Sequence, residues 1–348
     1  MTGARALKPG LLHGDILINL DSETEGELYV GCAGGLDATA AATYTMKPAL
    51  ESGYECWSLA VKGFKGGHSG MDIVLCRANA NKVAARVLYP LLKEAGVKLL
   101  DLEGGTLRNA IPREAFATVY VPVAKIKKAK AIVERVAAEV RAEHAATDPE
   151  CEFIFKPYEA APGEVCNHDT DCAYVDERKA LRFIRAILAC PDGVDRMSDA
   201  MPGLVETSNN MAMVKIEKGE FFVKSLLRGS VDSGKAYLAQ KLSAVFELAG
   251  AKVTFTGGYS GWAPNNASPI LHTMKAVYKK MYGKQPKVMA IHAGLECGIL
   301  GGTYPHWDMV SFGPTLMSPH SPDERAYIPS VQKAWDFLKG VLEAIPEK

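Results

Sequence analysis

The alternation of strand-like and helical periodicity over residues 56–156 constrains the fold of this chain more than any other feature. Apolar residues recur in the order strand 56–63, helix 80–95, strand 97–102, strand 116–123, helix 126–145 and strand 151–156. This β-α-β-β-α-β order is typical of a ferredoxin-like α+β unit.

A related pattern follows, with a helix at residues 177–190, strands at 211–216 and 221–228, a helix at 233–249 and a strand at 251–256. We interpret it as a structural duplication of the first unit. The alternative is that the order recurs by chance, because two-layer folds commonly alternate helices and strands.

The flanking segments predict one α/β domain that the duplicated region interrupts. A strand at residues 14–20 needs a partner, because an open strand edge is an aggregation hazard, and the late strands at 287–292 and 308–312 can supply one. A Gly/Pro-rich stretch marks a boundary near residue 258. We therefore predict an α/β domain built from residues 1–37 and 259–348, with an inserted lid domain at residues 38–258.

The last helix begins at Pro329, which is a favoured first-turn residue. Its apolar stripe is predicted to pack in a core and consists of Val331, Trp335, Leu338, Leu342 and Ile345.

Composition excludes several classes of partner. The 348 residues favour two domains, and the 40 basic and 40 acidic residues cancel, which leaves no electrostatic footprint for nucleic acid or a membrane surface. The eight cysteines include no Cys-x-x-Cys pair and are expected to be reduced thiols. No apolar run is long enough for a transmembrane helix. We predict a cytoplasmic protein with no nucleic-acid or membrane partner.

Two residues are candidate metal ligands. Asp21 follows the first predicted strand, at the end where open α/β sheets place ligands, and carboxylate oxygen suits Zn²⁺ or Mn²⁺. His320 lies in a loop between Pro319 and Pro322, which restrict its position. A solvated acidic turn and an ordinary loop histidine are the alternatives.

Other polar residues are candidates for substrate contact. His68 follows two glycines and could donate a hydrogen bond to an oxyanion, or could lie in an ordinary glycine turn. Asn109 offers an amide, and Arg228 a guanidinium that can hold a carboxylate. His292 and Glu296 could face a cleft or be satisfied internally. The polar run at residues 206–210 is read as a loop with turn chemistry.

Together these runs resemble a known family. The segments 18–27, 31–35, 67–70, 109–112, 206–210, 292–296 and 320–324 are similar, in order and spacing, to motifs of the aminoacyl-histidine (cytosol non-specific) dipeptidases, which are co-catalytic zinc peptidases. The match extends across essentially the whole chain.

The resemblance implies a catalytic α/β domain with a lid that closes over a dipeptide, and a homodimer as a candidate assembly. It implies two zinc ions, with Mn²⁺ or Co²⁺ as alternatives. Asp21 and His320 match ligands of different metals, and His68 matches the lid histidine that stabilises the tetrahedral intermediate. Asn109 and Arg228 match residues that hold the substrate, and His292 and Glu296 match a substrate-side segment.

One departure from the family pattern concerns activity. The family's His-x-Asp pair, bridging Asp and Glu-Glu pair, which supply three further ligands and the general base, have no match here. We therefore expect this chain to be the C-terminal portion of a longer enzyme, lacking about its first third, and to be inactive alone, because catalytic zinc usually has about three protein ligands.

Two alternatives stay open. The chain could be a non-catalytic peptide-binding or assembly module, or another hydrolase of the same clan, such as an aminoacylase or tripeptidase.

Overall fold

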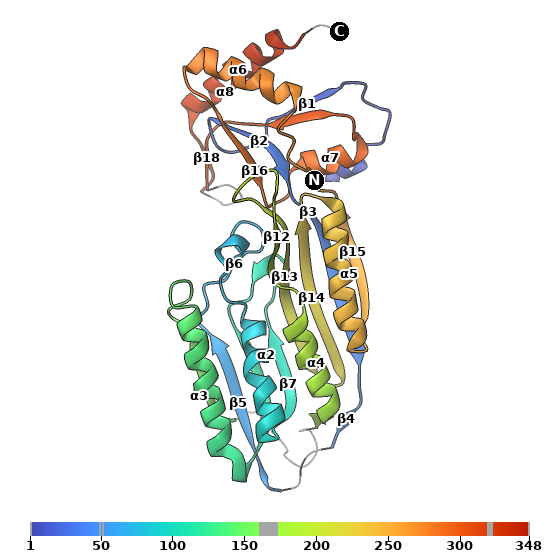
Figure 1. Cartoon of the computed structure of the whole chain (residues 1–348), viewed down its shortest axis with the longest axis vertical. Helices are drawn as coiled ribbons and strands as arrows, with labels where there is room; N and C mark the ends of the chain where they lie inside the picture. The colour runs from blue at the N-terminus through green and yellow to red at the C-terminus, as the bar shows by residue number, and fades with distance from the viewer. Residues whose placement is uncertain (1, 49, 51, 160–172, 319–322, 347–348) are drawn as a thin grey trace.

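The chain forms an elongated lower part and a smaller upper α/β part. The computed structural model describes residues 2–48, 50, 52–159, 173–318 and 323–346. Figure 1 shows the long sheet of the lower part running down the molecule, with the C-terminus at the top of the upper part and the N-terminus near the junction. We call the lower part the lid.

The first half of the lid is a ferredoxin-like unit, as predicted. Its elements in chain order are β5 (Tyr54–Lys62), α2 (Ala80–Pro90), β7 (Lys98–Gly104), β9 (Ala115–Pro122), α3 (Ile126–Glu143) and β10 (Glu152–Pro157). A π-helical turn at Leu91–Ala95 continues α2. The strand order β10-β5-β9-β7 is antiparallel throughout. This is the order of a split β-α-β unit.

The second half repeats that arrangement and confirms the duplication. Its elements are β3 (Gly34–Thr43), α4 (Glu177–Ala189), β13 (Val205–Glu217), β14 (Glu220–Gly229), α5 (Asp232–Leu248) and β15 (Lys252–Tyr259). The strand order β13-β14-β3-β15 reverses that of the first half, and a short strand, β12 (Gly193–Met197), pairs with β13. Because β3 precedes β5, the first unit is inserted between the first strand and first helix of the second.

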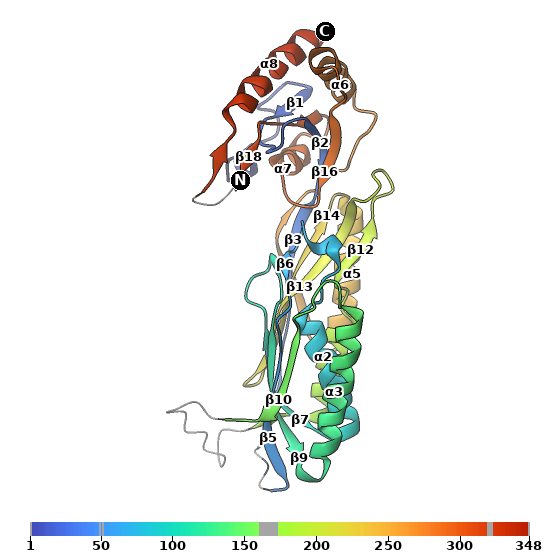
Figure 2. The ribbon, with the colours of Figure 1, turned by 90° about the vertical axis from the view of Figure 1, so that its left-hand side faces the viewer.

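The two units share one sheet and one core. Strands β7 and β13 pair antiparallel where the units meet, with Leu102 opposite Ile216. Figure 2 shows the lid helices on one face of this sheet. One buried apolar cluster extends from Ala38 to Ala251, and within it the rings of Phe183 and Phe221 stack 4.2 Å apart. The two halves are therefore a single folding body.

The upper part contains a four-stranded sheet ordered β1-β17-β2-β16. Its strands are β1 (Ile16–Asn19), β2 (Glu27–Cys32), β16 (Lys287–Ile291) and β17 (Asp308–Ser311), and its helices are α1 (Thr2–Ala6), α6 (Pro269–Tyr282), α7 (Glu296–Thr303) and α8 (Ile328–Ala344). Strand β1 pairs in parallel with β17, which confirms that the first strand finds its partner late in the chain.

Short strand pairs complete the described structure: β4 (Met46–Lys47) with β11 (Tyr174–Val175), β6 (Gly67–His68) with β8 (Ala110–Ile111), and β18 (Leu316–Met317) with β19 (Arg325–Ala326). None of the described helices is both long enough and apolar enough to cross a membrane.

Two segments connect the parts. Strands β3 and β15 lie side by side in the lid, and their continuations meet in the upper part through a bridge between Cys32 and Trp262. The Nζ of Lys235 donates to Oδ1 of Asp232 at 2.8 Å and to the carbonyl oxygen of Tyr259 at 2.6 Å, which ties α5 to the connection. The predicted domain limits at 37/38 and 258/259 fall inside these two strands and stay predictions.

The packing predicted for the last helix is wrong for three residues. The side that α8 buries carries Phe337 and Val341, whereas Val331, Trp335 and Leu342 are 45%, 56% and 57% exposed. Leu338 and Ile345 are half-buried against the upper core. The helix has apolar residues on more than one face, so periodicity could not select the face that packs.

Candidate functional site

His68 lies on a short hairpin at the upper end of the lid. Strand β6 pairs with β8, which places His68 opposite Ala110. Its Nδ1 accepts hydrogen bonds from the backbone N–H groups of Gly70 at 3.2 Å and Met71 at 3.1 Å. Burial and the charge of Arg228 lower the pKa of His68, against an opposing effect of Asp72. A neutral ring that accepts at Nδ1 carries its proton on Nε2, so His68 offers an Nε2–H donor.

Arg228 lies at the end of β14 and is 5% exposed. Its Nε and one terminal nitrogen donate to Oγ of Ser69 at 3.3 and 3.2 Å. Among the described residues no carboxylate lies within 4.0 Å of the guanidinium. Burial lowers the pKa of Arg228, with Tyr259 and Asp37 opposing the effect. A buried charge without a partner is costly, so this guanidinium is suited to receive an anionic ligand.

His292 follows β16 and is 6% exposed. Its Nε2 lies 2.7 Å from Oγ of Ser208, on the lid strand β13. Burial, followed by the charge of Arg228, lowers the pKa of His292 to about 4. The imidazole is therefore neutral at physiological pH and belongs to a contact between the upper part and the lid.

Gly70 marks the point where these three residues converge. A Cβ atom at this position would overlap the carbonyl oxygen of His292 and would lie 3.1 Å from Cε1 of His68 and 3.2 Å from Nε of Arg228. The structure thus brings together three residues that are far apart in the sequence, and only a glycine fits between them.

The two other predicted substrate residues, Asn109 and Glu296, are not among the three that converge around Gly70. Asn109 is exposed, and its backbone carbonyl accepts from the N–H of Ser69 at 2.9 Å. The buried Asn210 holds this loop through hydrogen bonds from Nδ2 to the carbonyl oxygens of residues 108 and 110. Glu296 begins α7 and is half-buried, and no hydrogen bond or ion pair joins it to His68, Arg228 or His292 in the described structure.

Only one of the two predicted metal ligands lies among the described residues. Asp21 is exposed beyond the end of β1, beside the buried Ser22, whose Oγ lies 2.7 Å from Oγ of Ser311. His320 lies outside the described residues. No group of three or more His, Cys, Asp or Glu side chains converges within the described ranges. A metal centre that contains Asp21 and His320 therefore stays a prediction.

The reading of residues 206–210 as a loop is wrong, because they belong to β13. All five are buried, and several of their polar atoms have no hydrogen-bond partner in the part of the chain that the structure describes, including Oδ1 of Asn209 and Oδ1 of Asn210. The absence of large apolar residues hid this end of the strand. Ser208 belongs to a segment that resembles the family's motifs, but nothing in the sequence assigned it an individual role.

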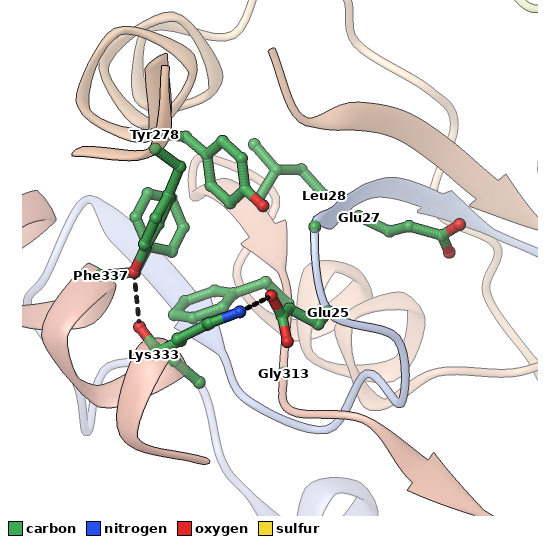
Figure 3. A pocket seen from close by; sticks show the side chains of 11 residues that line it. Glu25, Glu27, Leu28, Tyr278, Gly313, Lys333 and Phe337 are labelled. Carbon is green, nitrogen blue, oxygen red and sulfur yellow. Dashed lines mark hydrogen bonds and ion pairs between the residues drawn. The ribbon is translucent and has the colours of Figure 1, made fainter. Parts of the chain in front are cut away.

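A separate pocket in the upper part is too small for a peptide. It lies between α6, α8 and the start of β2, and Figure 3 shows Tyr278 and Phe337 on its walls and the ion pair of Lys333 with Glu25, whose Nζ and Oε1 are 2.8 Å apart. Its volume of about 20 Å³ is room for one water molecule. None of the predicted site residues lines this pocket, whereas three of them converge around Gly70.

Comparison with known proteins identifies the class to which this fold and site belong. Residues 59–148 match the family model described as a peptidase dimerisation domain of the M20 type. The crystal structure of aminoacylhistidine dipeptidase from Vibrio alginolyticus matches with a TM-score of 0.92 and 42% identity, over 100% of this chain and 69% of that one.

The sequence of the cytosol non-specific dipeptidase of Escherichia coli (strain K12) is 41% identical over 348 residues, which is 100% of this chain and 70% of the relative. The chain therefore belongs to the M20 peptidases and, within them, to the family of the aminoacyl-histidine and cytosol non-specific dipeptidases.

Proposed function

We propose that this protein acts in the metal-dependent hydrolysis of dipeptides of the Xaa-His or non-specific type, and that its lid binds the substrate. The observation that carries the proposal is the buried guanidinium of Arg228, which lacks a carboxylate partner among the described residues and lies near His68 and His292. A dipeptide brings a free carboxylate, which Arg binds bidentately. The names of two relatives more than 40% identical to the chain support the same substrate class.

His68 has the protonation state that peptide hydrolysis needs from a lid residue. Its Nδ1 accepts two backbone hydrogen bonds, so Nε2–H is free to donate to the oxygen that gains negative charge when the peptide carbonyl is attacked. Burial and the charge of Arg228 lower the pKa of His68, which favours the neutral ring, and a neutral ring donates a hydrogen bond without placing a second positive charge beside Arg228. Asn109 and Glu296 are proposed to contact the substrate from the lid loop and from α7.

Binding can be measured independently of turnover. Isothermal titration with β-alanyl-L-histidine should show binding that β-alanyl-L-histidinamide, which lacks the carboxylate, does not reproduce. Arg228→Gln should weaken binding by about a hundredfold, because one partner of a charged hydrogen-bonded pair is lost. Arg178→Gln, on an exposed arginine of α4, is the matched control. Equal affinity for the dipeptide and its amide would contradict the proposal.

The metal belongs to the same proposal. Two zinc ions, or Mn²⁺ or Co²⁺, would polarise the peptide carbonyl and activate water, with Asp21 and His320 as ligands of different ions. Because only two ligands are matched, one for each ion, we expect the 348 residues alone to bind zinc weakly and to hydrolyse nothing measurable, since catalytic zinc usually has about three protein ligands. Titration with Zn²⁺ and a dipeptidase assay test this, and clear turnover by the purified chain would overturn it.

A non-catalytic peptide-binding module is the second candidate function. It is favoured by one contrast. The substrate-side residues converge around Gly70, whereas within the described ranges no group of three or more His, Cys, Asp or Glu side chains comes together. Dipeptide binding that is unchanged by zinc, together with absent turnover in the presence of zinc, would favour this module over the enzyme.

Location and assembly are the last parts of the proposal. A cytoplasmic location is supported by the word cytosol in the name of the Escherichia coli relative. The matched dimerisation domain suggests a homodimer, but the β7 edge of that unit is already paired with β13 of the same chain. A homodimer would therefore have to use another surface, and light scattering would show whether one forms.

A further inference from the structure

The hydrogen bond between Ser208 and His292 links the two parts of the molecule inside the candidate site. Ser208 is fully buried on β13, and its Oγ lies 2.7 Å from Nε2 of His292. Ser208 is also the direct cross-strand partner of Arg228 in the antiparallel pair of β13 and β14. Directly opposed residues point to the same face of a sheet, so the imidazole that Ser208 holds lies on the same side as the guanidinium.

The location of the imidazole proton decides what the ring can bind. The other ring nitrogen, Nδ1, is buried and has no hydrogen-bond partner in the described structure. If Nε2–H donates to Ser208, then Nδ1 carries a lone pair and cannot bind an anionic ligand. If the hydroxyl donates to Nε2, then Nδ1 carries the proton and can donate to an anion. The serine makes one hydrogen bond to the ring in either arrangement, and only the second leaves a buried N–H that a ligand carboxylate would satisfy.

The surroundings of the ring keep it neutral. Burial and the charge of Arg228 lower the pKa of His292, and the backbone of Val205 opposes this by favouring a ring N–H. A ring with its proton on Nδ1 is a neutral donor that adds no charge to the site. Nδ1–H and the Arg228 guanidinium are then two buried donors on one side of the sheet, both without an anionic partner among the described residues.

We propose that Ser208 is a positioning residue that fixes His292 as an Nδ1–H donor, and that His292 and Arg228 together hold the carboxylate of the ligand. This inference rests on the proposed function for the identity of the ligand. The contact between Ser208 and the ring does not depend on the ligand.

The ring proton can be observed directly in the ¹⁵N-labelled chain. Long-range ¹H–¹⁵N correlation spectra at pH 7 should show His292 with a pyrrole-like Nδ1 and a pyridine-like Nε2. In Ser208→Ala the fraction of the Nδ1–H form should fall, and Ser208→Thr, which keeps the hydroxyl, should restore it. Ser225→Ala removes another buried serine hydroxyl, on β14, and should leave the His292 signals unchanged.

A stability defect alone would not produce this pattern, because it would not depend on a hydroxyl at one of two buried serines. A pyridine-like Nδ1 in the unaltered chain, or an unchanged tautomer in Ser208→Ala, would overturn the inference.

Unlabelled β-alanyl-L-histidine then tests the ligand. It should shift the Nδ1 signal of His292 and the Nε signal of Arg228, the amide analogue should shift neither, and Ser208→Ala should weaken binding about tenfold. A dipeptide that shifts the Arg228 signal but not the His292 signal would refute the inference and leave the proposed function standing. A dipeptide that shifts neither would refute the proposed function and the carboxylate assignment with it.

Discussion

The lid and the upper α/β part differ in how completely they bury their apolar side chains. The lid core is one cluster that joins both repeats and includes stacked aromatic rings. The upper cluster is smaller, and its last helix presents a stripe to the surface in which Ile328 is 80% and Trp335 56% exposed. The contrast indicates that the lid carries its own stability, whereas the upper part depends more on its connections.

Hydrogen exchange should give the largest measurable difference between the two parts. Amides in β13 and β14 at the centre of the lid sheet should exchange about a hundredfold more slowly than amides in β1 and β16 at the edges of the upper sheet, because they open only with the whole lid. Amides of the upper part that exchange more slowly than amides of the lid would contradict this comparison.

Removing an aromatic ring from each part compares their cores directly. Phe221→Ala should lower the free energy of unfolding by about 3–5 kcal/mol, because a fully packed ring leaves a cavity. Trp335→Ala in the upper part should change it by less than about 0.5 kcal/mol, since that ring is largely exposed. Urea denaturation followed by circular dichroism measures both, and similar losses would show that α8 is packed in solution.

The contact between the parts should be sensitive to acid. The pKa of His292 is about 4 in the folded chain, against an ordinary value of 6.5. The unfolded chain therefore binds the proton more readily. The free energy of unfolding has its full value above pH 6.5 and falls by about 3 kcal/mol as the pH drops to 4. His292→Gln should flatten this part of the pH profile of unfolding. An unchanged profile would place the acid-sensitive group elsewhere.

The close approach at Gly70 can be tested with one methyl group. Gly70→Ala should cost about 1–3 kcal/mol of stability and weaken dipeptide binding, because the new Cβ overlaps the carbonyl oxygen of His292. Gly14→Ala is the control, since its Cβ would meet nothing closer than 3.9 Å. If Gly70→Ala changes neither the free energy of unfolding nor the affinity for the dipeptide, then residue 70 does not lie in close contact with the backbone of His292.

The smallest expected effect belongs to the ion pair beside the small pocket in Figure 3. Lys333→Met should leave thermal stability almost unchanged, because the lysine is half exposed and its attraction to Glu25 is screened by solvent. Added salt should reduce the difference further. A larger loss in thermal unfolding would mean that this pair holds α8 in place.

Sequence reasoning predicted the strongly periodic elements and missed those made of small or polar residues. The first repeat was recognisable because its helices and strands carry large apolar side chains in regular patterns. Strand β3 was missed, and a domain limit was placed inside it, because its sequence from Gly34 to Thr43 contains only one large apolar residue. The upper end of β13 was read as a loop for a similar reason, since its buried side chains are polar.

The candidate site was predictable residue by residue but not as an arrangement. His68, Arg228 and His292 were identified from the family pattern, and the structure adds the way in which Gly70 and the pairing of Ser208 with Arg228 bring them together. Those contacts depend on strand register and on a serine to which the sequence assigned no individual role. Neither can be inferred from spacing along a single chain.

The insertion of one repeat inside the other has a consequence during protein synthesis. Strand β3 leaves the ribosome well before its neighbour β14, which follows about 180 residues later. At usual translation rates β3 must wait about 10–40 s for that partner. Its small side chains and the charge of Asp37 suit such a delay, because a strand with little apolar surface is slow to associate with other nascent chains. The composition that concealed β3 in the sequence would also protect it until the second half of the lid is made.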